Sequence, residues 1–130
     1  MLSNTDVVRA LLQAYTDKDR TAIEALVADK FRFTSPNDNG IDRETYFEKC
    51  WPNCERIVAI EIKRTVDDGD HVFVVSEIRM KKGKGMRNCE LHTVHDSKVT
   101  EIEVYFGWTV PHEASPGGHV EETDEKIGAA

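Results

Sequence analysis

Acidic, basic and amide side chains recur within the most strand-like part of the sequence. From His71 to Trp108, apolar and polar residues alternate, and Gly-rich or Asp-Ser segments interrupt the alternation, which predicts three antiparallel strands joined by hairpins. One face of such a sheet must pack on helices, so some polar side chains within it point inward. The polar residues at spacings of two are Glu77, Arg79, Asn88, Glu90, His92 and Glu103.

Glu90 and Asn88 are the pair in this set that could act on a bound molecule. Desolvation raises the pKa of a carboxyl group enclosed by apolar side chains, so such a group can exchange a proton near neutral pH. We therefore regard Glu90 as a candidate general acid or base and Asn88 as a candidate holder of a substrate oxygen. The competing interpretation is structural, with Glu90 paired to Arg79, Arg87 or His92 or facing solvent.

The turn that follows this strand decides which way Glu90 points, because a one-residue slip in register exchanges the two faces of a strand. A two-residue loop, 96–97, places Cys89 opposite Val104. The amide and the carboxylate then share the face of Glu103 and Tyr105.

A three-residue loop, 95–97, gives the other register. It places Glu90 opposite Ile102 and Asn88 opposite Val104. The carboxylate and the amide then stand on one apolar wall, which would line a pocket, with Ile102, Val104, Phe106 and Trp108. The sequence leaves both registers open.

The length and charge of the chain limit its fold class and its kinds of partner. A chain of 130 residues suits one domain, and helical and strand-like segments in separate blocks predict an α+β fold. The net charge is −7, but the segment from Pro111 onward holds five acids and one lysine, which leaves −3 on residues 1–110. The only basic cluster surrounds a hairpin tip, so we expect no nucleic-acid partner. No apolar run approaches the ~20 residues of a membrane span, and we expect no membrane association.

The cysteines are three in number, Cys50, Cys54 and Cys89, and no signal peptide precedes them. This pattern favours a cytoplasmic protein with reduced thiols. Cys50 and Cys54 with a histidine could bind zinc, but Pro52 interrupts a loose spacing, and we expect buried thiols, no metal and no cofactor.

Three helical segments are predicted before the long strands. Ser3 or Asn4 can cap a helix whose apolar stripe includes Leu11 and Tyr15. Thr21 and Glu24 form the pattern of a capping box that opens a short helix through Val27. A third helix is expected over 43–51, capped by Asp42 and ended by Pro52.

Strands surround the third helix. The alternation over 31–34 predicts a strand, and residues 35–40, with Pro36 and several turn formers, cannot continue it. Asp38 lies in this turn, near the expected rim of the sheet, and is a second candidate acid or base. A long strand is expected over 57–66, with Val58, Ile60, Ile62 and Val66 on one side.

Aromatic residues gather on the third helix. Tyr46, Phe47, Cys50 and Trp51 form one broad apolar face, which could be plain packing or a wall around a flat apolar ligand. Tyr15 is expected in the core with its hydroxyl at an edge, where a ligand could supply its hydrogen-bond partner.

This order of elements resembles the SnoaL-like families of the nuclear transport factor 2-like superfamily. The resemblance covers residues 5–108 and rests on 34–36 after the first strand, on 46–52, and on 96–99 leading to 104–108. It implies a cone-shaped, cystatin-like α+β fold in which a curved antiparallel sheet packs against three N-terminal helices. The domain then spans residues 1–110, and residues 111–130 form an acidic tail expected to be disordered.

The resemblance does not carry an activity over directly. Ketosteroid isomerases place their general-base Asp where this chain has Ser35, and their oxyanion-hole Tyr at the position of Leu11. Their protonated Asp corresponds best to Glu90, which favours an inward Glu90. The superfamily's epoxide hydrolases carry an Asp where this chain has Val104.

Two functions follow as hypotheses. The first is a cofactor-independent isomerase, cyclase or dehydratase that acts on a small apolar carbonyl or hydroxyl compound, with Glu90 and Asp38 as catalytic residues. The second is a non-catalytic binding or dimerisation module, and a homodimer is expected under either. The predicted ligand-binding residues are Tyr15, Phe33, Ser35, Tyr46, Trp51, Asn88, Val104 and Phe106.

Overall fold

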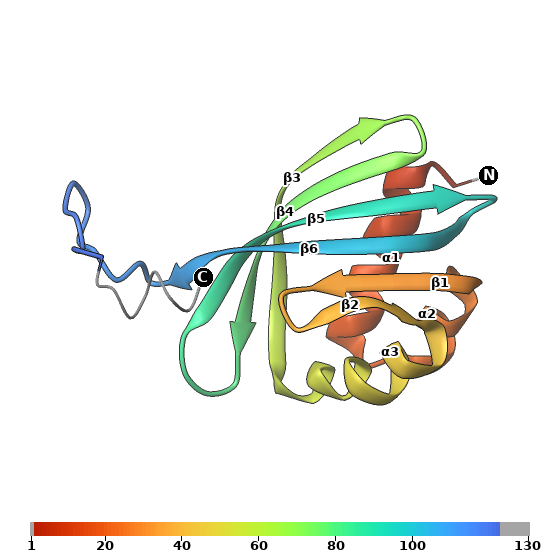
Figure 1. Cartoon of the computed structure of the whole chain (residues 1–130), viewed down its shortest axis with the longest axis horizontal. Coiled ribbons are helices and arrows are strands. Elements are labelled where there is room, and N and C mark those ends of the chain that lie inside the picture. The colour runs from red at the N-terminus through yellow and green to blue at the C-terminus, as the bar shows by residue number, and fades with distance from the viewer. Residues whose placement is uncertain (1, 123–130) are drawn as a thin grey trace.

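The computed structural model describes residues 2–122, which form an α+β domain (Figure 1). The helices precede or interrupt the first strands, and four long strands follow them. The elements are α1 (Asn4–Asp17), α2 (Arg20–Leu26), β1 (Val27–Ser35), β2 (Asp38–Asp42), α3 (Arg43–Lys49), the 3₁₀ helix η1 (Trp51–Arg56), β3 (Ile57–Asp68), β4 (His71–Met80), β5 (Gly85–His95) and β6 (Lys98–Val110). The predicted fold class, α+β with three N-terminal helices, is confirmed.

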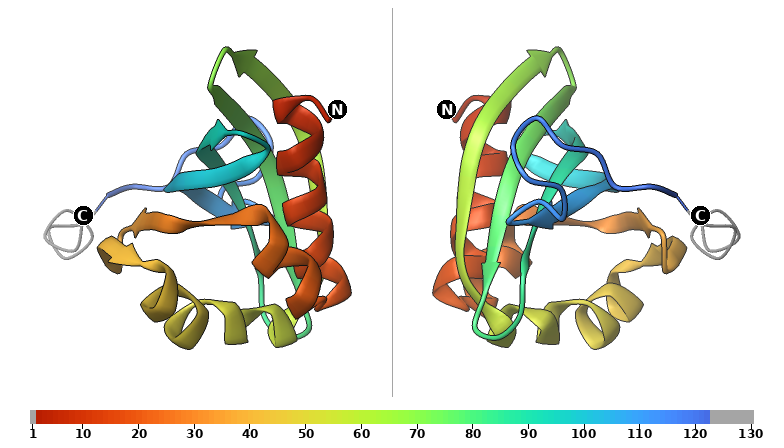
Figure 2. Two further views of the ribbon diagram at one scale, coloured as in Figure 1. Left: turned by 90° about the vertical axis from the view of Figure 1, so that its right-hand side faces the viewer. Right: turned by 90° about the vertical axis from the view of Figure 1, so that its left-hand side faces the viewer.

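The strands form one curved sheet in the order β2-β1-β6-β5-β4-β3. Neighbouring strands are antiparallel except β1 and β6, which run parallel, so the sheet is mixed and not antiparallel throughout as predicted. The parallel pair arises because β6, the last strand, inserts beside β1 after the chain has passed through four other strands, β2 to β5. Figures 1 and 2 show the sheet bending around one side, where α1, α2 and α3 lie.

The helix caps explain where the helices begin. The Ser3 hydroxyl accepts a hydrogen bond from the Asp6 backbone amide at 3.0 Å, and Asp42 caps α3 in the same way, as predicted. The predicted cap of α2 is wrong, because Asp19 and not Thr21 accepts from a backbone amide of the first turn. The helix therefore starts earlier and ends at Leu26, and Val27 already belongs to β1.

The segments that follow β1 differ from the prediction. Residues 38–42 form a strand, β2, which pairs with β1 across a tight turn at Pro36 and Asn37. The sequence hides this hairpin because β2 itself consists of turn-forming residues and Ile41. Helix α3 ends at Lys49, and Pro52 lies in the first turn of η1, where its missing amide hydrogen costs nothing.

Strand β3 contains two register shifts, one between Ile57 and Ala59 and one between Ile62 and Arg64. Each shift changes which residues point inward, since a strand alternates its faces residue by residue. Ile60 and Ile62 pack against the core, whereas Val58 and Val66, predicted on the same side, are exposed.

The core lies between the helices and the concave face of the sheet. Its fully buried side chains come from α1, β1, α3 and the inner face of the long strands, and include Val8, Leu11, Phe31, Tyr46, Val74 and Ile102. No helix within residues 2–122 has the length and apolar character needed to cross a membrane.

Strand β6 ends at Val110, and residues 111–122 form no regular helix or strand. The prediction of a disordered tail falls partly on residues 123–130, which lie outside the described residues.

Candidate functional site

The turn between β5 and β6 sets the direction of Glu90. Its loop has two residues, Asp96 and Ser97, both with positive φ, as the first of the two alternatives required. A β-bulge at Thr100 then adds one residue to β6, so that Glu90 pairs with Val104 and not with Ile102. Both predicted registers are therefore wrong in detail, although the face assigned by the three-residue loop is the one observed.

A second bulge, at Gly107, ends the inner wall of β6. Asn88 pairs with Phe106, whereas its neighbour Arg87 pairs with Trp108. A side chain at Gly107 would come within 2.3 Å of the Arg87 carbonyl oxygen, which explains why glycine occupies the bulge. Trp108, predicted on the inner wall, consequently turns to the outer face and lies beside the Arg87 guanidinium.

A cavity of about 310 Å³ lies between the inner face of the sheet and the helices. This volume is at the lower end of the range for small-molecule sites, and its walls are mainly apolar. The apolar lining residues are Leu11, Leu12, Phe33, Ile57, Ile60, Ile78, Met80, Met86, Ile102, Val104 and Phe106. The polar lining residues are Tyr15, Ser35, Asn37, Asp38, Tyr46, Cys50, Asn53, Arg56, Asn88 and Glu90.

The structure brings together all but one of the predicted site residues. Both candidate acids, Glu90 and Asp38, line the cavity, as do the predicted ligand-binding residues apart from Trp51. Trp51 opens η1 and is buried against the rings of Tyr15 and Phe47, with ring centroids 5.1 and 6.3 Å apart. Its predicted place in the cavity wall was wrong, because its ring packs in the core against these two rings and does not reach the cavity. The roles of the lining residues stay predictions.

Glu90 is held by a buried histidine. Its carboxylate oxygen Oε1 lies 2.8 Å from His92 Nε2, and its side chain is only 12 % exposed. His92 is fully buried, and its other ring nitrogen, Nδ1, has no hydrogen-bond partner among the described residues. The same two-residue alternation that placed Glu90 inward also placed His92 inward, but the sequence suggested for it only a structural pairing.

Two phenols form the deep polar group of the cavity. The hydroxyls of Tyr15 and Tyr46 share a hydrogen bond that joins α1 to α3. Burial raises the pKa of both hydroxyls well above the usual value, and the Glu90 carboxylate nearby raises them further. Both phenols therefore stay protonated, and since one donates to the other, one O–H remains for a ligand oxygen.

A second polar cluster surrounds Asp38. The Ser35 hydroxyl donates to Asp38 Oδ2 at 2.6 Å, and the Cys50 thiol lies 3.8 Å from the same oxygen. Burial, followed by the Asp38 carboxylate, raises the pKa of the Cys50 thiol to about 11. Cys50 is therefore a neutral thiol and not a nucleophile at physiological pH.

Neither cluster resembles a metal centre. Within residues 2–122, no three His, Cys, Asp or Glu side chains come together as a ligand set. The chemistry that the cavity can offer is hydrogen bonding and proton transfer by a carboxylate beside neutral phenols.

Comparisons with known proteins agree with this architecture. A family model described as the SnoaL-like domain matches residues 8–102. No curated protein matches the chain.

Several solved structures share the fold. An NTF2-like protein of unknown function from Cytophaga hutchinsonii is 19 % identical, with a TM-score of 0.69 over 82 % of this chain and 92 % of that one. IdmH, a candidate polyketide cyclase from Streptomyces antibioticus, is 16 % identical, with a TM-score of 0.71 over 81 % and 92 %. An LEH-like epoxide hydrolase from M. tuberculosis is 21 % identical, with a TM-score of 0.69 over 80 % and 82 %. At these identities the likeness establishes the NTF2-like fold.

Proposed function

Because the chain belongs to the SnoaL-like domain family, we propose that its cavity binds a small, mainly apolar carbonyl or hydroxyl compound and that Glu90 moves a proton on it. The reaction is of the isomerase, cyclase or dehydratase type and needs no cofactor. The observation that carries the proposal is the largely buried Glu90 carboxylate in a mainly apolar cavity, beside two neutral phenols.

The arrangement suits proton abstraction next to a carbonyl group. One oxygen of Glu90 is bound to His92, which leaves the other oxygen to accept a proton from a ligand carbon. The electron pair of the broken C–H bond moves to the carbonyl oxygen as an enolate forms. The free O–H of the Tyr15 and Tyr46 pair can donate to that oxygen, and return of the proton to another carbon completes an isomerisation.

The structural neighbours support this class of chemistry without specifying it. One neighbour is a candidate polyketide cyclase and another an epoxide hydrolase, so the same fold serves small-molecule reactions of more than one kind.

Exchange of protons on a simple ketone tests the proposal. Menthone, an apolar monocyclic ketone, is incubated with the protein in D₂O, and deuterium at the carbons next to its carbonyl group is followed by NMR. We expect catalysed exchange that Glu90→Gln lowers by roughly a hundredfold or more, since a positioned acid or base contributes about 10²–10⁴. Glu103→Gln, on the outer face of β6, is the matched control and should exchange like the wild type.

Equal exchange by the Glu90→Gln variant would refute a catalytic carboxylate at this position. Menthone that binds without catalysed exchange would instead favour a binding module. Asp38 is the second candidate acid or base, and Asp38→Asn in the same assay determines whether it takes part.

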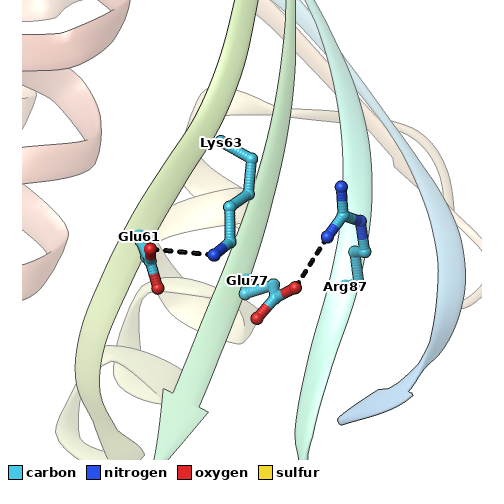
Figure 3. A network of polar contacts seen from close by, with 4 residues as sticks. All are labelled: Glu61, Lys63, Glu77 and Arg87. Carbon is cyan, nitrogen blue, oxygen red and sulfur yellow. Dashed lines mark hydrogen bonds and ion pairs between the residues drawn. The ribbon is translucent and has the colours of Figure 1, made fainter. Parts of the chain in front are cut away.

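We also propose that the protein forms a homodimer through the outer face of the sheet. Phe73 and Tyr105 are 38 % and 54 % exposed there, beside Leu91 and Cys89 on β5. Charged pairs flank this apolar area: Lys63 reaches Glu61 at 2.8 Å and Arg87 reaches Glu77 at 2.7 Å (Figure 3).

We also propose that the protein is located in the cytoplasm. This location accords with three cysteines that are all free thiols.

A further inference from the structure

Two polar side chains on neighbouring strands are buried without a hydrogen-bond partner. Asn88 is 6 % exposed and Ser76 fully buried, and the two residues are directly opposite each other on β5 and β4. Neither Asn88 Oδ1 nor Ser76 Oγ has a partner among the described residues. Leaving such groups unpaired is costly, and native proteins rarely do so.

A hydroxyl group would satisfy both residues. It can donate to the amide oxygen of Asn88 and accept from the Ser76 hydroxyl, and if the amide is turned around it can accept from the amide nitrogen and donate to Ser76. A carbonyl oxygen can only accept a hydrogen bond, so it can pair with the Ser76 hydroxyl or the amide nitrogen of Asn88 but leaves the amide oxygen of Asn88 without a partner. Asn88 lines the cavity, whereas Ser76 does not line it and lies next to Asn88 on β4. A molecule in the cavity therefore reaches Asn88 first.

We propose that Asn88, backed by Ser76, is a subsite for a hydroxyl group of the ligand. The inference rests on the proposed function, because it concerns the same cavity. It also narrows the substrate class to apolar carbonyl compounds that carry an additional hydroxyl group.

The geometry limits where this hydroxyl stands. Asn88 and Glu90 point to the same side of β5 two residues apart, a separation of about 7 Å along the strand. The hydroxyl therefore lies within a few bonds of the carbon that Glu90 deprotonates. A cavity of about 310 Å³ is at the lower end of the range for small-molecule sites, so it suits a ligand of about the size of a monocyclic ketone.

The same hydroxyl chemistry could come from a water molecule that stays in place when a ligand binds. The two sources predict different affinities for a pair of ligands that differ only by one hydroxyl group. A ligand hydroxyl improves binding only when the subsite is open to the ligand, whereas a retained water makes the added hydroxyl useless or harmful.

Menthone and hydroxymenthone form a suitable probe pair of this size. Their dissociation constants are measured by calorimetry for the wild type, Ser76→Ala and Asn88→Leu. We expect the wild type to bind hydroxymenthone about tenfold more tightly than menthone, and both variants to lose this preference while still binding menthone. Thr93→Val, a hydroxyl deletion near the opposite face of β5, is the matched control and keeps the preference.

Ser76→Ala should fold without difficulty, because it removes a buried hydroxyl that has no partner. If the unfolding midpoint of this variant equals that of the wild type, a lost preference for hydroxymenthone over menthone does not result from a lost structure. Equal binding of the two probes by the wild type, or a preference that survives both variants, would overturn the subsite and leave the proposed function standing. Failure of both probes to bind the wild type would count against the cavity's proposed function itself.

Discussion

His92 is the side chain that fixes the orientation of the Glu90 carboxylate. Its Nε2 is 2.8 Å from Glu90, and its Nδ1 is buried without a partner. An ionised carboxylate can only accept hydrogen bonds, so the hydrogen in this contact is carried by Nε2 and donated to Glu90. In the proposed reaction His92 would therefore act as a positioning residue, since it does not line the cavity.

Substitutions of His92 distinguish its hydrogen bond to the Glu90 carboxylate from its packing as a buried side chain. His92→Leu removes the donor to Glu90 and should lower kcat for ketone exchange by roughly tenfold to a hundredfold, the equivalent of a hydrogen bond to a charged group, with little change in KM. His92→Gln keeps an N–H near the same place and should restore most of kcat. Equal kcat in the two variants would show that the hydrogen bond does not position the carboxylate.

Cys50 reports on the charge of Asp38. The pKa of its thiol is raised to about 11, first by burial and then by the Asp38 carboxylate. Asp38→Asn removes the charge and lowers this pKa towards its ordinary value, so the thiolate fraction at pH 9 should increase severalfold. Alkylation by iodoacetamide, followed by mass spectrometry, measures the change, with Cys89 on the outer face as internal reference. An unchanged Cys50 rate would mean that Asp38 is not ionised beside it.

At the scale of the element, the bulge at Thr100 decides which side chains of β6 face the cavity. Deleting Thr100 removes the bulge and leaves two observed pairs, Val94 with Val99 and Thr93 with Glu101, as neighbours in a regular ladder, so Ile102 and Val104 keep facing the cavity. We therefore expect the deletion variant to fold and to keep catalysed exchange on menthone, with a free energy of unfolding changed by about 1–3 kcal/mol.

Thr100→Ala is the matched control for this deletion. It keeps the number of residues and removes only a 3.3 Å hydrogen bond to the Thr93 carbonyl, which should cost about 1 kcal/mol in urea unfolding. A folded deletion variant that has lost the exchange activity would show that β6 takes another register without Thr100 and that Val104 no longer faces the cavity beside Glu90.

The same bulges mark the limit of what the sequence predicts. Caps at Ser3 and Asp42 and the alternation of the long strands are local signals, and they gave the helices, the meander and the fold class. The bulge at Thr100 has no compositional mark, and an isolated glycine such as Gly107 is only a weak sign of one, so neither the Glu90 pairing nor the outward turn of Trp108 could be predicted directly. The inward Glu90 was favoured only through the resemblance to a related acidic position.

For the whole molecule, the two faces of the sheet differ in their surroundings. The inner face holds the cavity, and the outer face leaves an apolar strip across β4, β5 and β6 that no described element covers. On this strip Phe73 and Leu91 are direct cross-strand neighbours, as are Cys89 and Tyr105. Charged residues lie on both sides of it, with Arg64 and the Lys63–Glu61 pair on β3 and the acidic residues Glu101 and Glu103 on β6.

In the proposed homodimer, the apolar strip of one copy meets the strip of the other across a twofold axis. An axis through the β4 and β5 region would place β3 of one copy over β6 of the other, so Arg64 of each copy faces the acidic border of its partner while the apolar strips meet. We expect light scattering to give twice the chain mass of 14.7 kDa. Phe73→Lys should yield a folded monomer, because it buries an unpaired charge only in the dimer. Glu55→Lys, on η1, should remain a dimer, and a wild-type mass of one chain at micromolar concentration would exclude this assembly.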